Sequence, residues 1–427
     1  MVLKLNLNKL RGRLALAILA LAGSSLLVVL IISMFVIGTL ADDRLLVTRD
    51  TLQVPVGHFP NSARLNARMA SAELSESDRD LANAKAHARR AVDLSPHDYR
   101  FRITLASIEE AEGDRSAAEA SLEAARALAP NYWDVHYRLG NLLVREGKLA
   151  QSLDEFRIAV AANNALLPGT LDLLWRASRG DVNAFQTATG TSPKARLTLA
   201  QFLLRVSRPA EAESVFGSID REGRLAASTE TAAFLNALIA AGELGPARDF
   251  WSDLAGADSQ SMLVWNGGFE RELLRNFAQF DWLFGRSEYA RLTIDAAVAH
   301  SGSRSLKIEF AGRDTTQLDN EIKQLVPVRS GARYTLECYA KTSELETPEG
   351  PRVVVANSAS PAWIAASEPV AGGSGDWRRL VVDFVAPQSV SGGMSAVFIS
   401  IKRKPKFSYD EPTRGTVWFD DFSLKEQ

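Results

Sequence analysis

Residues Leu14 to Leu40 form a run of 27 residues without a single charged side chain. An apolar run of 18 or more residues is typical of a transmembrane helix. At ~1.5 Å rise per residue this one would be ~40 Å long, enough to cross a hydrocarbon core of ~30 Å with some tilt. The sequence therefore predicts that residues 14–40 span a lipid bilayer once.

Basic residues gather ahead of this run. Residues 1–13 contain four basic and no acidic residues, whereas only Arg44 and Arg49 follow the run closely. The positive-inside rule then places the N-terminal tail in the cytoplasm and residues 42–427 on the other side of the membrane.

A cleaved signal peptide is the alternative interpretation, because Ala20 to Ala22 before Gly23 resemble a small-residue cleavage site. The apolar region of a signal peptide is only ~7 to 15 residues long. Here the run continues for 17 residues after Gly23, which favours a retained anchor.

Composition excludes several classes of protein. Lys and Arg number 49 against 51 Asp and Glu, so the charge balance gives no indication of nucleic-acid binding. The lone Cys338 excludes an intrachain disulfide, and an exported protein without disulfides points to a bacterial envelope more than to a eukaryotic secretory route. No two of the five His show a metal-ligand spacing, so they do not indicate a zinc site.

A regular period begins at about Asn61, after a proposed spacer over residues 41–60. Alanine and leucine dominate from there, and apolar residues recur at three and four positions, which is typical of amphipathic helices. Pro96 and Pro130 are 34 residues apart, and Asn164 holds the equivalent place 34 residues further on. A fixed period of this length indicates structural repeats.

Two units, beginning at Tyr99 and Trp133, show the pattern most clearly. Small residues stand where two helices would cross, a glycine stands at the turn, and a large apolar residue is on the second helix. The first unit carries Leu105, Ala106, Gly113, Ala118, Leu122, Ala125 and Pro130, and the second carries Leu139, Gly140, Gly147, Phe156 and Ala159. This pattern resembles the tetratricopeptide repeat, a helix-turn-helix unit that stacks into a right-handed superhelix. Weaker units at about 65–98, 193–226 and 228–261 extend the resemblance, and a degenerate one interrupts it at 167–192.

The resemblance implies a concave surface, lined by the first helix of each repeat, that binds an extended peptide or a partner domain. Asn141 and Asn236 occupy the position where some peptide-binding members carry an Asn that holds the ligand backbone. The alternative is that these are ordinary solvated polar positions. The residues expected on this surface are Arg100, Ser107, Tyr137, Asn141, Gln201 and Asn236.

Helical composition ends near Ser259 to Leu263. Short runs rich in Val, Thr and aromatic residues follow, separated by turn signals, and they predict an antiparallel β-sandwich. The expected strands are 290–294, 305–310, 321–327, 334–341, 352–357, 378–385, 396–401 and 417–424.

Five phrases occur in order along this part of the chain. They are WNGGFE from Trp265, HSGSRSLKIEF from His300, QLVPVRSGARYTLECYAK from Gln324, GDW from Gly375 and VWFDDFSL from Val417. Together they resemble the jelly-roll fold of carbohydrate-binding modules and galactose-binding-like domains. The resemblance implies a lectin-like sandwich over residues 262–427.

The last expected strand contains two adjacent aspartates, and its alternation points one of them toward the core, where a buried carboxylate needs compensation. In the family a structural calcium often lies at this place. The resemblance implies Glu270 and Asp420 as ligands, with carbonyl groups near 301–303. Alternatively, Glu270 pairs with Arg304 or Lys307.

Modules of this fold stack exposed aromatic side chains on sugar rings. Trp282 could instead close the core, and only Trp363, in a stretch rich in Ser, Pro and Ala, looks free. The basic stretch 402–407 could meet an acidic polysaccharide or be a solvated turn. The expected carbohydrate-binding residues are Trp363, Trp282, Tyr289, Tyr409 and Phe407.

No GxSxG, HExxH, P-loop or GxGxxG phrase occurs, so the sequence predicts no enzyme. It predicts instead a multidomain chain with a cytoplasmic tail (1–13), a transmembrane helix (14–40), a linker (41–60), an all-α repeat superhelix (61–261) and an all-β jelly-roll sandwich (262–427).

This architecture resembles membrane-bound repeat proteins associated with exopolysaccharide or cell-envelope glycan assembly. The resemblance implies a single-pass protein of the bacterial inner membrane with its bulk in the periplasm. Its repeats would dock a protein partner and its sandwich would contact polysaccharide. The alternatives are a pure protein scaffold whose sandwich binds no ligand, and an accessory subunit of a glycan-active enzyme.

Overall fold

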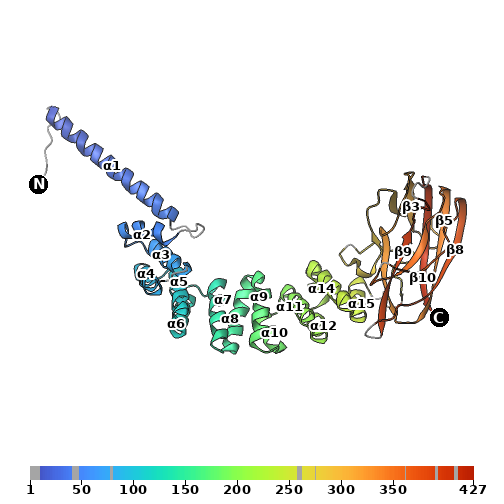
Figure 1. Cartoon of the computed structure of the whole chain (residues 1–427), viewed down its shortest axis with the longest axis horizontal. Coiled ribbons are helices and arrows are strands. Elements are labelled where there is room, and N and C mark those ends of the chain that lie inside the picture. Colours follow the sequence, from blue (N-terminus) through green and yellow to red (C-terminus); the bar gives the residue numbers. More distant parts are fainter. Residues whose placement is uncertain are drawn as a thin grey trace. The chain divides into compact units, whose positions relative to one another are not determined.

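The computed structural model describes residues 10–40, 48–76, 80–256, 262–274, 276–360, 362–389, 393–407 and 412–427. Contacts divide the chain into two compact units, residues 1–190 and 191–427. The described part of the first unit is helical, and the second unit joins helices to two β-sheets (Figure 1). The predicted fold class, an apolar helix, helical repeats and an antiparallel sandwich, is confirmed.

The first unit begins with α1 (Leu10–Leu40). Within it, Leu16–Phe35 has a mean hydropathy of 2.6 and is not buried against the rest of the chain. By length and composition this helix can cross a membrane. A signal sequence meets the same criteria, so both interpretations of the sequence fit α1.

Helical hairpins follow, each built as the repeat predicts. Gly113 and Gly147, in the turns of two hairpins, have φ of +87° and +77°, the left-handed region that glycine adopts without strain. One hairpin therefore corresponds to one 34-residue period. The paired helices are α3 (Ala63–Ser75) with α4 (Leu81–Leu94), α5 (Tyr99–Ala111) with α6 (Arg115–Leu128), and α7 (Trp133–Arg145) with α8 (Leu149–Ala162).

The helices α7 and α8 cross at Gly140. A Cβ atom at this glycine would lie 2.9 Å from Cε1 of Phe156, closer than side chains tolerate. Phe156 is fully buried. Because Gly140 has no side chain, the Phe156 ring packs directly on the backbone of α7.

The structure corrects the expected spacer over residues 41–60. Helix α2 (Arg49–His58) forms there, and its Leu52 and Val56 are buried in a cluster with Leu65 and Met69 of α3. Pro55 lies inside this short helix, which is why the stretch resembles a spacer in sequence. Residues 41–47 lie outside the described residues.

The register of the repeats breaks where the sequence predicts it, between residues 167 and 192. Here η1 (Asn164–Leu166), α9 (Leu167–Ala177) and α10 (Val182–Thr189) replace the regular hairpin. The second unit starts with five further helices, α11 (Pro193–Arg205), α12 (Pro209–Gly217), α13 (Arg221–Ala226), α14 (Ser228–Ala241) and α15 (Leu244–Ala255).

Two five-stranded antiparallel sheets form the sandwich, in the orders β1-β4-β9-β6-β7 and β2-β3-β10-β5-β8. Each expected strand overlaps an observed one, whereas the short strands β1 and β7 are missed. The strands are β1 (Leu283–Phe284), β2 (Ala290–Asp295), β3 (Ser305–Ala311), β4 (Ile322–Arg329), β5 (Arg333–Glu346), β6 (Arg352–Asn357), β7 (Trp363–Ala366), β8 (Gly373–Val385), β9 (Met394–Lys402) and β10 (Arg414–Glu426).

In the second unit, the last helix and the sandwich pack together through a buried contact. Trp251 of α15 is fully buried, and its Nε1 atom donates a hydrogen bond to the Phe277 carbonyl oxygen at 2.6 Å. Its ring centroid lies 5.4 Å from that of Trp265 and 5.7 Å from that of Phe280. Helix α15 also lies against β4 and β9. The last repeat and the sandwich are therefore packed together, although the sequence suggests a simple boundary between them.

We predict that Gly140→Ala destabilises the first unit, although alanine favours helices over glycine by ~1 kcal/mol. The added methyl group must displace the Phe156 ring, and overpacking of this kind costs ~1 to 3 kcal/mol. Thermal melting of the full chain in detergent, followed by helical circular dichroism, measures the change. Gly57→Ala in α2 is the control, because nothing lies within 4 Å of its added Cβ. Equal melting temperatures for the two variants would contradict the packing described here.

Glu73 of α3 is 3% exposed, and its Oε2 atom has no hydrogen-bond partner among the described residues. Burial, followed by the charge of Asp80, raises the pKa of Glu73 from the ordinary 4.5 to about 7. The Glu73 carboxyl group therefore binds its proton more tightly in the folded state than in the unfolded state. The resulting stability is present below the unfolded pKa and is lost as the pH rises through about 7.

We therefore expect the melting temperature of the helical signal to fall between about pH 5 and about pH 8. Glu73→Gln should flatten this dependence, since glutamine does not titrate. A wild-type curve and a variant curve with the same pH dependence would show that Glu73 does not cause it.

Candidate functional site

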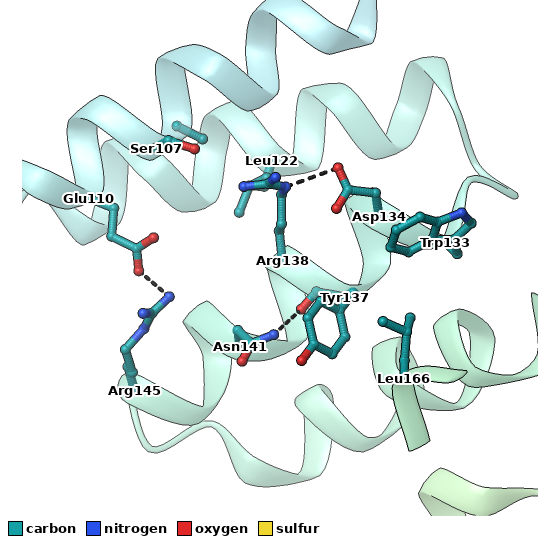
Figure 2. Close-up of a pocket in the computed structure, with 11 residues that line it drawn as sticks. Ser107, Glu110, Leu122, Trp133, Asp134, Tyr137, Arg138, Asn141, Arg145 and Leu166 are labelled. Atoms are coloured by element: carbon teal, nitrogen blue, oxygen red, sulfur yellow. Dashed lines mark hydrogen bonds and ion pairs between the residues drawn. The ribbon is translucent and has the colours of Figure 1, made fainter. Parts of the chain in front are cut away.

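A groove of about 430 Å³ runs along the first helices of two neighbouring repeats, α5 and α7, and ends at η1. It lies on the surface where the sequence expects a partner to bind. Figure 2 shows the side chains that line it. They are Ala106, Ser107, Glu110, Leu122, Trp133, Asp134, Tyr137, Arg138, Asn141, Arg145 and Leu166.

One end of the groove is apolar, with Trp133, Tyr137 and Leu166 (Figure 2). The Tyr137 ring meets the Phe156 ring edge-on, with centroids 5.9 Å apart. Because Phe156 is the buried residue of the Gly140 crossing, the hairpin core supports the position of Tyr137. This end offers a partner two aromatic side chains on a rigid helix.

The charged side chains of the groove neutralise one another. Nε of Arg138 lies 3.0 Å from Oδ2 of Asp134 on the same helix. Arg145 of α7 forms an ion pair with Glu110 of α5, which joins the two repeats. In both pairs the arginine is exposed and the carboxylate is half-buried, so water screens the attraction and each pair contributes little to stability. Their main consequence is that this set of four charges carries no net charge.

Asn141 lies in the middle of the groove. Its Nδ2 donates a hydrogen bond to the Tyr137 carbonyl oxygen at 2.7 Å, one turn earlier in α7. This contact orients the amide and leaves its Oδ1 without a donor among the described residues. An amide oxygen held in this way can accept an N–H group from an extended peptide backbone.

The structure brings together Tyr137 and Asn141, together with Ser107, but not the other residues expected on this surface. Arg100 bonds Asp98 at 2.9 Å, near the start of α5, and does not line the groove. The remaining two, Gln201 and Asn236, belong to the second unit. Gln201 donates to the Glu230 carbonyl oxygen at 3.1 Å, and Asn236 is exposed on α14.

Sequence reasoning did not select Trp133, Arg138 or Arg145. The signal was present, because Trp133, Tyr137, Asn141 and Arg145 are each four residues apart and so occupy one face of α7. The expected set took Tyr137 and Asn141 from this face and left out Trp133 and Arg145, one turn beyond them at either end.

In the sandwich, Trp282 is corrected as a sugar-binding residue. It is 2% exposed, it packs against Phe269 and Phe422, and its Nε1 atom donates to the Asn266 carbonyl oxygen at 3.2 Å. A ring enclosed in this way supports the core and cannot stack on a sugar.

The other expected sugar-binding residues differ in exposure. Trp363 of β7 is 37% exposed, and Nζ of Lys404 lies 5.0 Å from its ring centroid, within the range of a cation–π contact. Tyr289 is half-buried before β2, and Phe407 is 59% exposed. Tyr409 lies outside the described residues.

Backbone N–H groups engage the two carboxylates expected to bind calcium. Glu270 accepts hydrogen bonds from the N–H groups of Ser303 and Arg304 at 2.7 and 2.8 Å. Asp420 is fully buried and accepts from His300 at 2.8 Å and Asp421 at 2.7 Å. Burial raises the pKa of Asp420 to about 6, and these N–H groups oppose the shift.

Both carboxylates lie close to Gly268, whose ideal Cβ would be 3.8 Å from Oδ1 of Asp420 and 3.9 Å from Cγ of Glu270. Within the described residues, however, no group of three His, Cys, Asp or Glu side chains converges as a metal site. Any calcium would therefore need carbonyl or water ligands as well. The calcium site stays a prediction.

A calcium ion at this place should raise the melting temperature of the full chain in excess calcium relative to chelator, because a ligand of the folded state stabilises it. Glu270→Gln should remove the rise. Identical melting in calcium and in chelator would remove Glu270 and Asp420 from the candidate ligands.

No family model and no curated protein matches this chain. Among solved structures, MamA is similar to 40% of this chain and 82% of its own, at 14% identity and TM-score 0.28. TTC0263, a thermophilic TPR protein of Thermus thermophilus, is similar to 31% of this chain and 70% of its own, at 20% identity and TM-score 0.26.

A CBM4 structure is similar to 38% of this chain and 99% of its own, at 21% identity and TM-score 0.28. A Stig cyclase, Fisc from Fischerella sp. TAU, is similar to 39% of this chain and 96% of its own, at 15% identity and TM-score 0.27. These TM-scores are all below 0.5, and the fold is established by the helices, strands and sheet order of the chain itself.

Proposed function

We propose that this protein is a non-catalytic, membrane-anchored scaffold of a bacterial envelope. Its repeats dock a protein partner in the groove on α5 and α7, and its sandwich contacts glycan. The observation that carries the proposal is the groove itself, where Trp133 and Tyr137 lie beside a polar amide, Asn141, on one rigid helix face.

The chemistry of the groove favours an extended segment of a partner protein. Its aromatic end receives an apolar side chain, and Oδ1 of Asn141 accepts a backbone N–H group. Because the two ion pairs of the groove balance, the occupant needs no strong net charge. Affinity then comes from apolar burial and backbone hydrogen bonds.

The proposed location follows from the N-terminal charge pattern. Helix α1 crosses the inner membrane with the basic tail inside, and the repeats and the sandwich lie in the periplasm. There the scaffold would hold a partner of the exopolysaccharide or envelope-glycan assembly machinery near its glycan. Trp363, exposed beside Lys404, is the aromatic side chain best placed to contact sugar.

In-cell photo-crosslinking tests the docking groove. A photoreactive residue in place of Ser107, inside the groove, should give discrete crosslinked products in the native host. The same residue in place of Arg157, exposed on α8, is the control and should not give them. Equal products from both positions, or none from Ser107, would contradict docking here.

The variant Asn141→Ala gives the sharpest result, because the hydrogen bond described for this side chain is to its own helix. Alanine also favours the helix, so the fold should be retained. Loss of one hydrogen bond of ~1 kcal/mol lowers affinity about fivefold, and the crosslink from position 107 should weaken accordingly. An unchanged yield would exclude Asn141 from partner binding.

Glycan binding is tested on a glycan array with the full chain in detergent. Trp363→Ala should weaken binding by roughly three- to tenfold, the value of an aromatic contact. Met394→Ala is a matched control, since Met394 is also 37% exposed and belongs to the same sheet. Binding of no glycan by the wild type would favour a pure protein scaffold.

A further inference from the structure

A second cavity, of about 270 Å³, opens at the edge of the sandwich where β8 pairs with β5. The segment between β7 and β8 closes its other side. We call this cavity the edge pocket. Its walls include Thr342, Glu368, Val370, Gly375, Arg378 and Leu380.

The pocket exists because the sheet is irregular there. Pairing of β5 with β8 shifts register between Ala340 and Thr342 and again between Thr342 and Leu345. Such bulges bend a strand away from its partner. Gly375 faces the gap, and an ideal Cβ on it would lie 3.5 Å from Oγ1 of Thr342. Gly375 is not among the residues with positive φ, so its backbone does not require glycine, and the missing side chain leaves room.

Three polar side chains of the pocket have no hydrogen-bond or ion-pair partner among the described residues. Thr342 is 8% exposed, and its hydroxyl forms no hydrogen bond with any described residue. The charged groups of Glu368 and Arg378 are exposed at the rim and form no ion pair within the described part of the chain.

The polar neighbours of these three residues are engaged. Lys341 pairs with Asp376 at 2.9 Å, and Ser374 Oγ accepts the Glu344 N–H group at 2.9 Å. The unpaired groups therefore occur where the cavity is, and not along the whole edge. Val370, which is 8% exposed, and Leu380 add aliphatic carbon atoms to the wall.

We propose that the edge pocket holds one saccharide unit at the end of a glycan chain. Its volume is below the ~300 to 1,000 Å³ of sites for drug-sized ligands, which suits a single sugar ring. The C–H groups of a pyranose match Val370 and Leu380. Its hydroxyl groups both donate and accept, so they can bond the Thr342 hydroxyl, the Glu368 carboxylate and the Arg378 guanidinium.

This assignment rests on the proposed glycan contact of the sandwich and gives it a definite site. It differs from stacking on Trp363, which would accept the interior of a glycan chain. A pocket that encloses one unit selects chain ends, so a free monosaccharide should occupy it.

Ligand-observed NMR of the full chain in detergent tests the pocket, with D-glucose, D-galactose, D-mannose, N-acetyl-D-glucosamine and D-glucuronate offered singly. At least one should give saturation transfer. Thr342→Val removes the hydroxyl group at nearly constant shape. It should lower the affinity for the sugar that binds the wild type by about 3- to 10-fold. Thr335→Val is the control, because Thr335 lies on the same strand but bonds Asp383 outside the pocket.

Gly375→Ala is the second variant. Its methyl group would lie in ordinary contact with Thr342, so melting should remain near wild type while the sugar signal falls. Sugar binding that survives both pocket variants, but is lost in Trp363→Ala, would overturn the pocket and leave the glycan contact standing.

The remaining outcomes distinguish failure of the pocket proposal from failure of the proposed glycan contact. An array that detects glycan while no monosaccharide binds would overturn the pocket alone. If neither the glycan array nor NMR detects binding, both the pocket proposal and the glycan function are wrong. L-Alanine, offered in the same way, is the non-sugar probe, and saturation transfer to it and to no sugar would assign the cavity to an amino acid and overturn the saccharide proposal.

Discussion

A helical hairpin with one apolar face cannot bury that face alone, and much of this structure follows from that constraint. Each repeat needs a neighbour, and the outermost faces need a cover of another kind. In the first unit α2 supplies it by burying Leu52 against α3. In the second unit the sandwich supplies it, because Trp251 of α15 is enclosed by Trp265 and Phe280. The sandwich is thus part of the core that completes the last repeat.

The same packing creates the groove. Where α7 and α8 cross at Gly140, the Phe156 ring packs on the glycine backbone and also contacts the Tyr137 ring edge-on. On this face of α7 the Tyr137 ring is therefore held by Phe156, and the Asn141 amide is held by the Tyr137 carbonyl oxygen. Preorganisation of this kind lowers the entropic cost of binding. One buried ring accordingly links repeat stability to the surface proposed for docking.

Sequence reasoning succeeded where a local pattern has one structural solution. The 34-residue period and the turn glycines Gly113 and Gly147 define the hairpins, and alternation defines most strands. It failed where the outcome depends on distant partners. Trp282 is enclosed by Phe422, which is far along the chain, and α2 forms around Pro55 because α3 is there to receive it.

The candidate sites show the same limit. Asn141 and Tyr137 were accessible to motif reasoning because the repeat fixes their positions. The edge pocket was not, because it arises from two register shifts in the pairing of β5 with β8, and a register shift leaves no clear pattern in sequence.

The proposal that α1 holds the repeats and the sandwich outside the cytoplasm is tested by protease treatment of intact spheroplasts of the native host. An antibody to the C-terminal region follows the chain, and a cytoplasmic protein serves as the control. We predict that external protease removes the C-terminal signal while the cytoplasmic protein survives. A C-terminal region that persists until detergent dissolves the membrane would contradict it.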